Sequence, residues 1–156
     1  MTRQVTILVG TMTGTAELVA QELEPVLSEA GFEVEILDMD GLNESVFDRP
    51  GTFIICTSTY GQGEVPDNAV AFYEGLQAGK PDLSKISFSV VGLGDSTYND
   101  TFNAGGRRFE ELLSSLGAEM ICARMVHNAS SDEMPEDMAL EWFEGWLAAM
   151  ESRADT

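Results

Sequence analysis

Strand-like and helix-like patterns alternate along all 156 residues of the chain. Short apolar runs rich in Val and Ile predict strands, and longer stretches with apolar residues at three- and four-residue spacing predict helices. The predicted strands are Val5–Val9, Phe32–Leu37, Thr52–Thr57, Ser87–Leu93 and Glu119–Val126. The predicted helices are Thr15–Ala30, Pro66–Gln77, Ala104–Leu116 and Pro135–Met150. The stretch Asp38–Gly51 is expected to be loop-rich, with at most one helical turn.

This alternation predicts an α/β fold, in which a five-stranded parallel sheet is covered by helices on both faces. The run Thr52–Thr57 has no polar alternation, as expected for a strand that is buried on both sides. The strand order 2-1-3-4-5 is one of the two common doubly wound solutions, and ligands of such sheets bind beyond the carboxyl ends of the strands. The length favours one domain over residues 1–156.

The helical periodicity also predicts which side chains face the core. These are Leu18, Val19, Leu23, Val26 and Leu27 in the first helix, Phe109, Leu112, Leu113 and Leu116 in the third, and Met138, Trp142, Trp146 and Leu147 in the last. Gly31 and Gly117 are expected to be C-caps. We expect Cys56 and Cys122 to be buried in strands in a reducing compartment, and His127 to be structural or solvent-facing.

The segment Gly10-Thr11-Met12-Thr13-Gly14-Thr15-Ala16 follows the first strand and opens the first helix. Free backbone N–H groups and the helix dipole make such an end an anion site, and hydroxyls add donors without charge. The loop has neither the Lys of a P-loop nor the third Gly of a dinucleotide fingerprint. The pattern favours a monophosphate held by neutral donors; an ordinary N-cap at Thr13 is the alternative.

Two further loops combine glycines and hydroxyls with an aromatic residue. Ser58-Thr59-Tyr60-Gly61-Gln62-Gly63-Glu64 follows the third strand, and Gly92-Leu93-Gly94-Asp95-Ser96-Thr97-Tyr98 follows the fourth and continues to Phe102. A tyrosine can cover the face of a flat ligand, while a glycine lets the backbone approach its edge. Either loop alone could be a turn with an exposed Tyr. Three such loops after neighbouring strands indicate a site for a planar, phosphorylated ligand.

The three loops resemble those of the flavodoxin family, particularly the FMN domains of sulfite reductase and cytochrome P450 reductase and the bacterial MioC-type flavodoxins. The likeness spans essentially the whole chain. It implies a flavodoxin-like doubly wound fold, one non-covalently bound FMN and a role in electron transfer. The chain lacks the long insertion of long-chain flavodoxins, so it is similar to the short-chain members. Its third loop is one residue longer than in the reductase domains.

The resemblance implies roles for individual residues. Thr11, Met12, Thr13, Gly14, Thr15 and Ala16 would bind the FMN phosphate. Tyr60 and Tyr98 would flank the isoalloxazine ring, and Gly61 would present a backbone group to flavin N5. The backbone of Leu93, Gly94 and Asp95 would meet the polar edge of the flavin or the ribityl chain, and Ser58, Thr59, Gly63 and Phe102 complete the expected cofactor-binding set. No catalytic or metal-binding residue is expected.

Acidic residues outnumber basic residues by 27 to 8, which gives a formal net charge of −19. Such a surface repels nucleic acid and anionic lipid and attracts basic proteins, although acidity also aids solubility by itself. We expect a monomer with basic-surfaced redox partners, such as an NADPH-flavodoxin/ferredoxin reductase and acceptor enzymes. No apolar run approaches membrane-spanning length and the first residues show no signal-peptide pattern, so we expect a cytoplasmic protein.

The predicted function is the shuttling of single electrons between a reductase and redox partner enzymes, without enzymatic activity of its own. The alternative is an FMN-binding accessory protein that supplies electrons for the maturation or activation of one enzyme. A phospho-acceptor receiver domain shares the strand order but needs paired acids after the first strand, where this chain has Gly10 and Thr11. A quinone reductase would need a hydride-donor site beside the flavin, for which the sequence offers no candidate.

Overall fold

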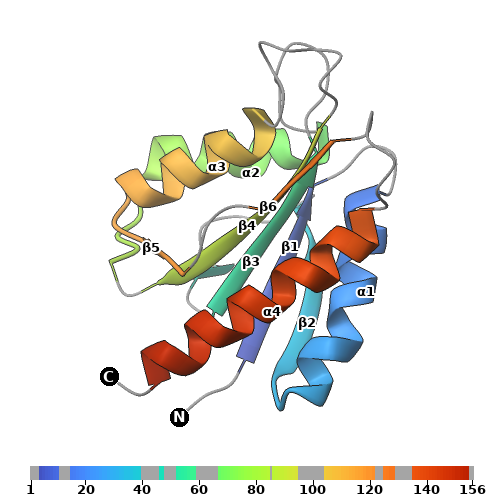
Figure 1. The fold of residues 1–156 in the computed structure, drawn as a ribbon. Helices are drawn as coiled ribbons and strands as arrows, with labels where there is room; N and C mark the ends of the chain where they lie inside the picture. The colour runs from blue at the N-terminus through green and yellow to red at the C-terminus, as the bar shows by residue number, and fades with distance from the viewer. Residues whose placement is uncertain are drawn as a thin grey trace.

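The computed structural model describes residues 4–10, 15–39, 46–47, 52–58, 67–84, 86–94, 104–121, 125–128 and 135–154. The strands are β1 (Gln4–Gly10), β2 (Glu33–Asp38), β3 (Thr52–Ser58), β4 (Ser87–Gly94), β5 (Glu119–Met120) and β6 (Met125–Asn128). The helices are α1 (Thr15–Glu29), α2 (Asp67–Gly79), α3 (Ala104–Ser115) and α4 (Pro135–Ala154). Figure 1 shows their arrangement.

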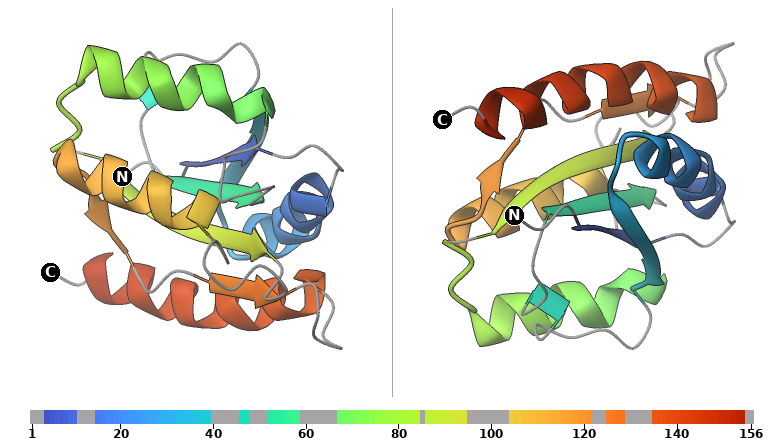
Figure 2. Two further views of the ribbon diagram at one scale, coloured as in Figure 1. Left: turned by 90° about the horizontal axis from the view of Figure 1, so that it is seen from above. Right: turned by 90° about the horizontal axis from the view of Figure 1, so that it is seen from below.

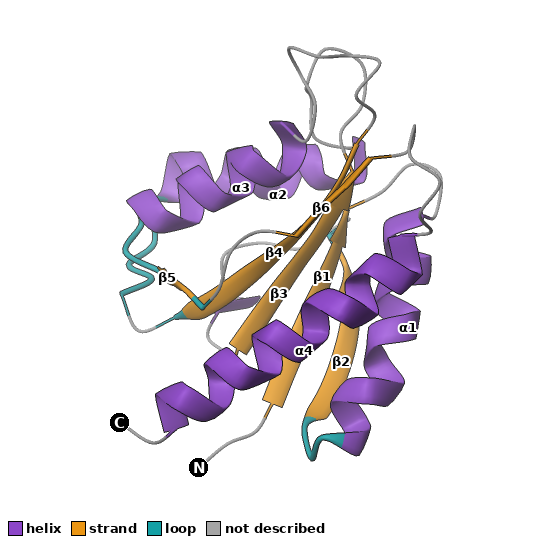
Figure 3. Cartoon of the chain, in the orientation of Figure 1, coloured by secondary structure: helices purple, strands orange, loops and turns teal. Residues whose placement is uncertain are grey.

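The strands run parallel in one sheet of order β2-β1-β3-β4-β5, with β6 also paired to β4. The predicted strand order is therefore confirmed. From β1 the chain moves outward to β2 and then returns to place β3 on the other side of β1, so the winding direction reverses between β1 and β3. The strands point towards one end of the molecule, and both termini lie towards the other end (Figures 1 and 3).

Two apolar clusters fill the two faces of the sheet, and the helices form a layer outside each of them (Figure 2). Because successive strand residues point to opposite faces, Ile54 and Cys56 face α1 and α4, while Phe53 and Ile55 face α2 and α3. Residues 52–57 are buried throughout, which confirms that β3 is covered on both sides.

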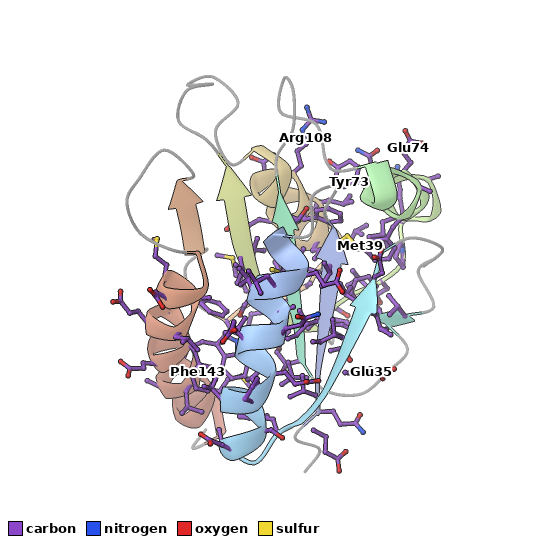
Figure 4. All side chains as sticks on the ribbon, turned by 90° about the vertical axis from the view of Figure 1, so that its right-hand side faces the viewer. Glu35, Met39, Tyr73, Glu74, Arg108 and Phe143 are labelled. Atoms are coloured by element: carbon purple, nitrogen blue, oxygen red, sulfur yellow. The ribbon has the colours of Figure 1, made fainter. Side chains whose placement is uncertain are left out.

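All the predicted core residues except Leu18 lie in these clusters, with graded burial. Trp146 is fully buried, and Phe143 of α4 packs in the same layer as α1 (Figure 4). Half-buried side chains at the margins of the clusters are Val26, Leu112, Leu116, Met138, Trp142 and Leu147. Between β2 and β3, Phe47 lies with its ring centroid 4.9 Å from that of Phe53, so this stretch contributes to the core.

The prediction that Leu18 faces the core is wrong. Val19, Leu23 and Leu27 are fully buried, whereas Leu18 keeps 43% of its surface exposed. Adjacent residues of a helix point about 100° apart around its axis. Because Val19 faces the core, Leu18 lies at the outer margin of the apolar stripe. The apolar side chain of Leu18 does not by itself indicate whether the residue is buried or exposed.

The prediction of one fifth strand over Glu119–Val126 is also wrong, because that strand is broken. Phe88 of β4 partners Met120 of β5, whereas Val91 partners Met125 of β6. Between these two pairs, β4 advances three residues, from 88 to 91, while its partner advances five, from 120 to 125. The register therefore shifts by two residues. The two extra residues on this side interrupt the ladder between β4 and its neighbour.

Helix ends follow the predicted caps. Gly31 (φ 95°) and Gly117 (φ 102°) have left-handed backbone conformations just beyond α1 and α3. Glycine adopts such angles without the steric cost that a Cβ brings, so both C-cap predictions are confirmed. Helix α4 continues to Ala154, beyond its predicted end at Met150.

Candidate cofactor site

Four residues at or near the carboxyl ends of the central strands form a level row. Gly10 of β1 is the register partner of Thr57 in β3, and Thr57 is the partner of Gly92 in β4. Gly92 in turn partners Val126 in β6. The segments that follow these four strands therefore leave the sheet side by side at one edge. In a doubly wound sheet, the reversal of winding between β1 and β3 opens a crevice at this edge.

Small residues occupy the centre of that row. Gly10 and Gly92 have no side chain, and Thr57 is fully buried. The middle of the row therefore carries no long side chain. A flat ligand could approach the backbone closely at such an edge.

Helix α1 begins close to this edge. It starts at Thr15, so residues 11–14 alone connect it to the last residue of β1, Gly10. Its first N–H groups have no acceptor within the helix, and its dipole favours negative charge at this end. The first turn carries Glu17 and no basic side chain, so an anion bound at this helix start would depend on backbone N–H groups and hydroxyls. This arrangement suits a phosphate held by backbone N–H groups and hydroxyls.

The structure places the backbone of five of the predicted site residues. Thr15 and Ala16 open α1, Ser58 ends β3, and Leu93 and Gly94 end β4. The pairing of Ser58 with Leu93 brings the second and third loops together. The other predicted residues, which lie outside the described parts of the chain, are Thr11, Met12, Thr13, Gly14, Thr59, Tyr60, Gly61, Gly63, Asp95, Tyr98 and Phe102.

Asn128 is not among the predicted site residues. It is the last residue of β6 and the register partner of Gly94, so residues 129–134 begin at the same edge as the three predicted loops. The parallel topology indicates that the segment after the last strand starts at this edge, because neighbouring parallel strands end at the same edge of the sheet. The prediction of a single unbroken strand misplaced its end, because an unbroken register would have set Val126 opposite Gly94.

Two ionisable groups near the sheet and helices have shifted pKa values. Burial raises the pKa of the Cys56 thiol to about 12, so this free cysteine stays protonated. Burial also raises the pKa of Tyr73, although the positive charge of Arg108 on the neighbouring helix acts to lower that pKa (Figure 4). Neither group changes its protonation near neutral pH. Within the described ranges, no three His, Cys, Asp or Glu side chains are grouped to hold a metal ion.

These features define a class of protein, a doubly wound α/β protein that binds a nucleotide-like cofactor at its topological switch point. The sequence profile of the flavodoxin family matches residues 7–146. The chain belongs to the flavodoxin family.

The comparisons with individual proteins agree. The chain is 37% identical to protein MioC of Escherichia coli strain K12 over 143 residues, which cover 92% of this chain and 95% of MioC. It is 36% identical to flavodoxin YqcA of Pectobacterium carotovorum over 151 residues, with 96% and 99% coverage. The sulfite reductase [NADPH] flavoprotein alpha-component of Bacillus subtilis is 34% identical over 151 residues, 96% of this chain and 24% of that protein. A solved flavodoxin variant from Pseudomonas aeruginosa gives a TM-score of 0.85 at 37% identity, covering 95% of this chain and 99% of that one.

The predicted family, fold and cofactor are therefore confirmed, and the protein is an FMN-dependent electron-transfer protein. Flavodoxins are electron carriers rather than enzymes. FMN supplies the redox chemistry, and the chain binds, orients and shields it. The described residues fit this cofactor, because the start of α1 suits its phosphate and because Gly10 and Gly92, which flank Thr57 in the row, carry no side chain.

Proposed function

We propose that this chain acts as a single domain over residues 1–156 and carries single electrons from a reductase to acceptor enzymes whose docking surfaces are basic. The FMN would be held by the loops 11–16, 58–63 and 93–102, with Thr13 at the phosphate and Tyr98 against the ring. The exchange would take place in the cytoplasm, where a reducing environment keeps a thiol such as Cys56 free.

The observation that carries the choice of partner is the charge of α1 and β2. No Lys or Arg occurs between residues 4 and 48. Among the residues of this stretch that the structure describes, the exposed acidic side chains are Glu17, Glu22, Glu24, Glu29, Glu33, Glu35 and Asp38. Helix α4 packs beside α1 in the same layer and adds Asp137, Glu141 and Glu144. A surface of one sign steers partners of the opposite sign and repels those of its own sign.

Leu18 is an exposed apolar side chain on this acidic surface, near the expected FMN site. Among the described residues it is the large apolar side chain that remains exposed, and it follows the loop 11–14 by one helical turn. Glu17 and Glu22 flank it on the exposed side of α1. Protein interfaces combine an apolar centre with a polar rim, so Leu18 supports docking at this end of α1.

Two variants on one helix test this proposal. The FMN-loaded protein is reduced, and its oxidation by cytochrome c, a basic haem protein, is followed at increasing salt. The second-order rate should fall by about tenfold or more between low and high salt, because screening removes the steering. Glu17→Gln at the cofactor end of α1 should reduce this salt dependence. Glu29→Gln makes the same charge change at the far end of the helix and is the matched control.

The outcomes separate the parts of the proposal. A rate that does not depend on salt would contradict a basic partner, even if electrons are transferred. Equal effects of Glu17→Gln and Glu29→Gln would show that the docking surface does not lie at the cofactor end of α1. If the reduced protein passes no electrons to any acceptor, the carrier role itself fails.

A further inference from the structure

The seam between α2 and α3 carries a half-buried tyrosine, Tyr73, on the face of the sheet opposite to α1 and α4 (Figure 4). Its ring meets that of Phe109 edge to face, with centroids 5.2 Å apart and planes inclined by 84°. Phe109 stacks in turn on Phe72 in the core, at a centroid distance of 6.2 Å. A ring held in this way has little conformational freedom to lose when a partner binds it.

Arg108 brings a positive charge to the same seam. It directly precedes Phe109 on α3, and its side chain is exposed. Burial raises the pKa of the Tyr73 phenol, and the charges of Arg108 and Glu111 act on that pKa in opposite directions, which places the three groups near one another. The phenol keeps its proton at neutral pH, so the seam offers a hydroxyl and a guanidinium as hydrogen-bond donors. Arginine and tyrosine are also enriched where protein interfaces bind most strongly.

Arg108 lies towards the cofactor edge. Helix α3 starts at Ala104, after the segment that follows β4, and Arg108 is in its second turn. The other end of α3 lies by the start of β4, where the N–H of Leu83 donates to the carbonyl of Leu116 at 2.9 Å. Figure 4 accordingly shows Arg108 at the end of the molecule towards which the strands point. Glu17 of α1 and Arg108 of α3 thus border the cofactor edge from opposite faces of the sheet.

The charge of the whole chain restricts how an anionic group can reach this seam. A net charge of −19 repels free anions, although one guanidinium attracts them locally. A protein with a basic docking face is attracted instead, and such a protein can also carry a carboxylate. A standard interface covers about 800 Å² of each partner, which is roughly 30 Å across. One partner over the cofactor edge can therefore contact Glu17 and Arg108 together, because a domain of this length has a radius of gyration of only about 15 Å.

We propose that Arg108 and Tyr73 bind a carboxylate of the electron-transfer partner, which therefore presents an acidic residue beside its basic patch. This inference rests on the proposed function, because it concerns the same docking partner. A guanidinium binds a carboxylate through two parallel N–H···O bonds, and the phenol can donate a third. Opposite charges at two separate points fix the orientation of a partner, whereas an acidic surface alone attracts any basic protein in many orientations.

The test measures oxidation of the reduced, FMN-loaded protein by cytochrome c at low salt. The acceptors are unchanged cytochrome c and a set of its variants, each with one lysine beside the haem edge replaced by glutamate. Arg108→Gln should speed oxidation by unchanged cytochrome c about twofold to fivefold, the scale of one surface charge interaction, because it removes a cation that faces lysines. With at least one glutamate variant the same substitution should slow oxidation by a similar factor, because it removes the partner of the new carboxylate.

Two further variants separate docking at the seam from a general effect of charge. Lys80→Gln makes the same charge change at the exposed residue that follows α2, at the end of that helix away from the cofactor edge, and should show no such reversal. Tyr73→Phe keeps the ring against Phe109 and removes the hydroxyl, so it should weaken the preference of the seam for the glutamate variant.

The outcomes distinguish this inference from the proposed function. If Arg108→Gln and Lys80→Gln have equal effects on every acceptor, the carboxylate contact is rejected although a basic partner stands. The contact is also rejected if no glutamate variant reverses the effect of Arg108→Gln. If transfer to unchanged cytochrome c does not depend on salt, the basic partner fails and this inference fails with it.

Discussion

Ser58 of β3 and Leu93 of β4 are register partners at the carboxyl edge of the sheet. β3 ends at Ser58 and β4 ends one residue after Leu93, so the segments 59–66 and 95–103 leave the sheet as neighbours. The segment 11–14 leaves from β1, which adjoins β3 on its other side. The three loops thus start within the width of three strands, about 10 Å. This spacing is what allows one cofactor to touch all of them.

The phosphate role of the first loop is tested by Thr13→Ala. Loss of one hydrogen bond to a charged group should weaken FMN binding by about 1.5–3 kcal/mol. Binding of riboflavin, which has the same ring and no phosphate, should change far less. Fluorescence titration of the apoprotein with both ligands measures the two affinities. Equal losses for FMN and riboflavin would contradict a contact between Thr13 and the phosphate.

The ring contact is tested by a pair of substitutions at Tyr98. Tyr98→Ala removes an aromatic stack and should weaken FMN binding by about 1–3 kcal/mol. Tyr98→Phe keeps the ring and should retain most of the affinity. The same titration compares the two variants. An alanine variant that binds FMN as tightly as the unchanged protein would reject the stacking role.

Two glycines should respond to alanine in opposite directions. Gly117 has φ +102°, and an added Cβ would lie 3.2 Å from the backbone N and 3.3 Å from Cα of Ser84. Gly117→Ala should therefore destabilise the fold by more than about 1 kcal/mol. Gly75 lies in α2 with nothing within 4 Å of an added Cβ, so Gly75→Ala should stabilise by about 0.5–1 kcal/mol. Urea unfolding at a fixed FMN concentration measures both, and shifts of the same sign would contradict this account.

Stability at high pH should depend on Cys56. Burial raises the pKa of its thiol from 9.0 to about 12, so the folded chain keeps this proton at a pH where the unfolded chain has lost it. Raising the pH from 9 towards 12 therefore favours unfolding, by up to about 1.4 kcal/mol per pH unit. Below pH 9 the thiol of Cys56 should not make the free energy of unfolding depend on pH. The free energy of unfolding is measured against pH for the unchanged protein and for Cys56→Ala, which lacks the group; parallel curves would contradict burial of the thiol.

The faces of the sheet could be predicted because they follow from local patterns, such as the apolar run of β3 and the stripe through Val19, Leu23 and Leu27. Right-handed crossovers leave few topologies, of which the order 2-1-3-4-5 is one of the two common ones, and the resemblance to flavodoxins favoured that order. The glycine caps could also be predicted from a local pattern, since a left-handed residue at a helix end favours glycine.

Leu18 and the β5–β6 break could not be predicted, because both depend on tertiary contacts. Leu18 lies at the margin of an apolar stripe, where a small rotation of α1 against the sheet decides between burial and exposure. The break depends on how far β6 slides along β4, and Glu119–Val126 alone reads as a continuous strand. The roles of Tyr60, Gly61 and Tyr98 stay predictions, since the described residues end just before those loops.

The most direct measurement is a titration of the metal-free, cofactor-free protein with FMN, followed by flavin absorbance and fluorescence. We expect one FMN to bind per chain and the bound flavin to show a perturbed yellow spectrum. Riboflavin should bind more weakly because it lacks the phosphate. A protein that folds with its α/β structure intact but takes up no FMN would contradict the central claim that the edge beside Gly10, Thr57 and Gly92 is a flavin site.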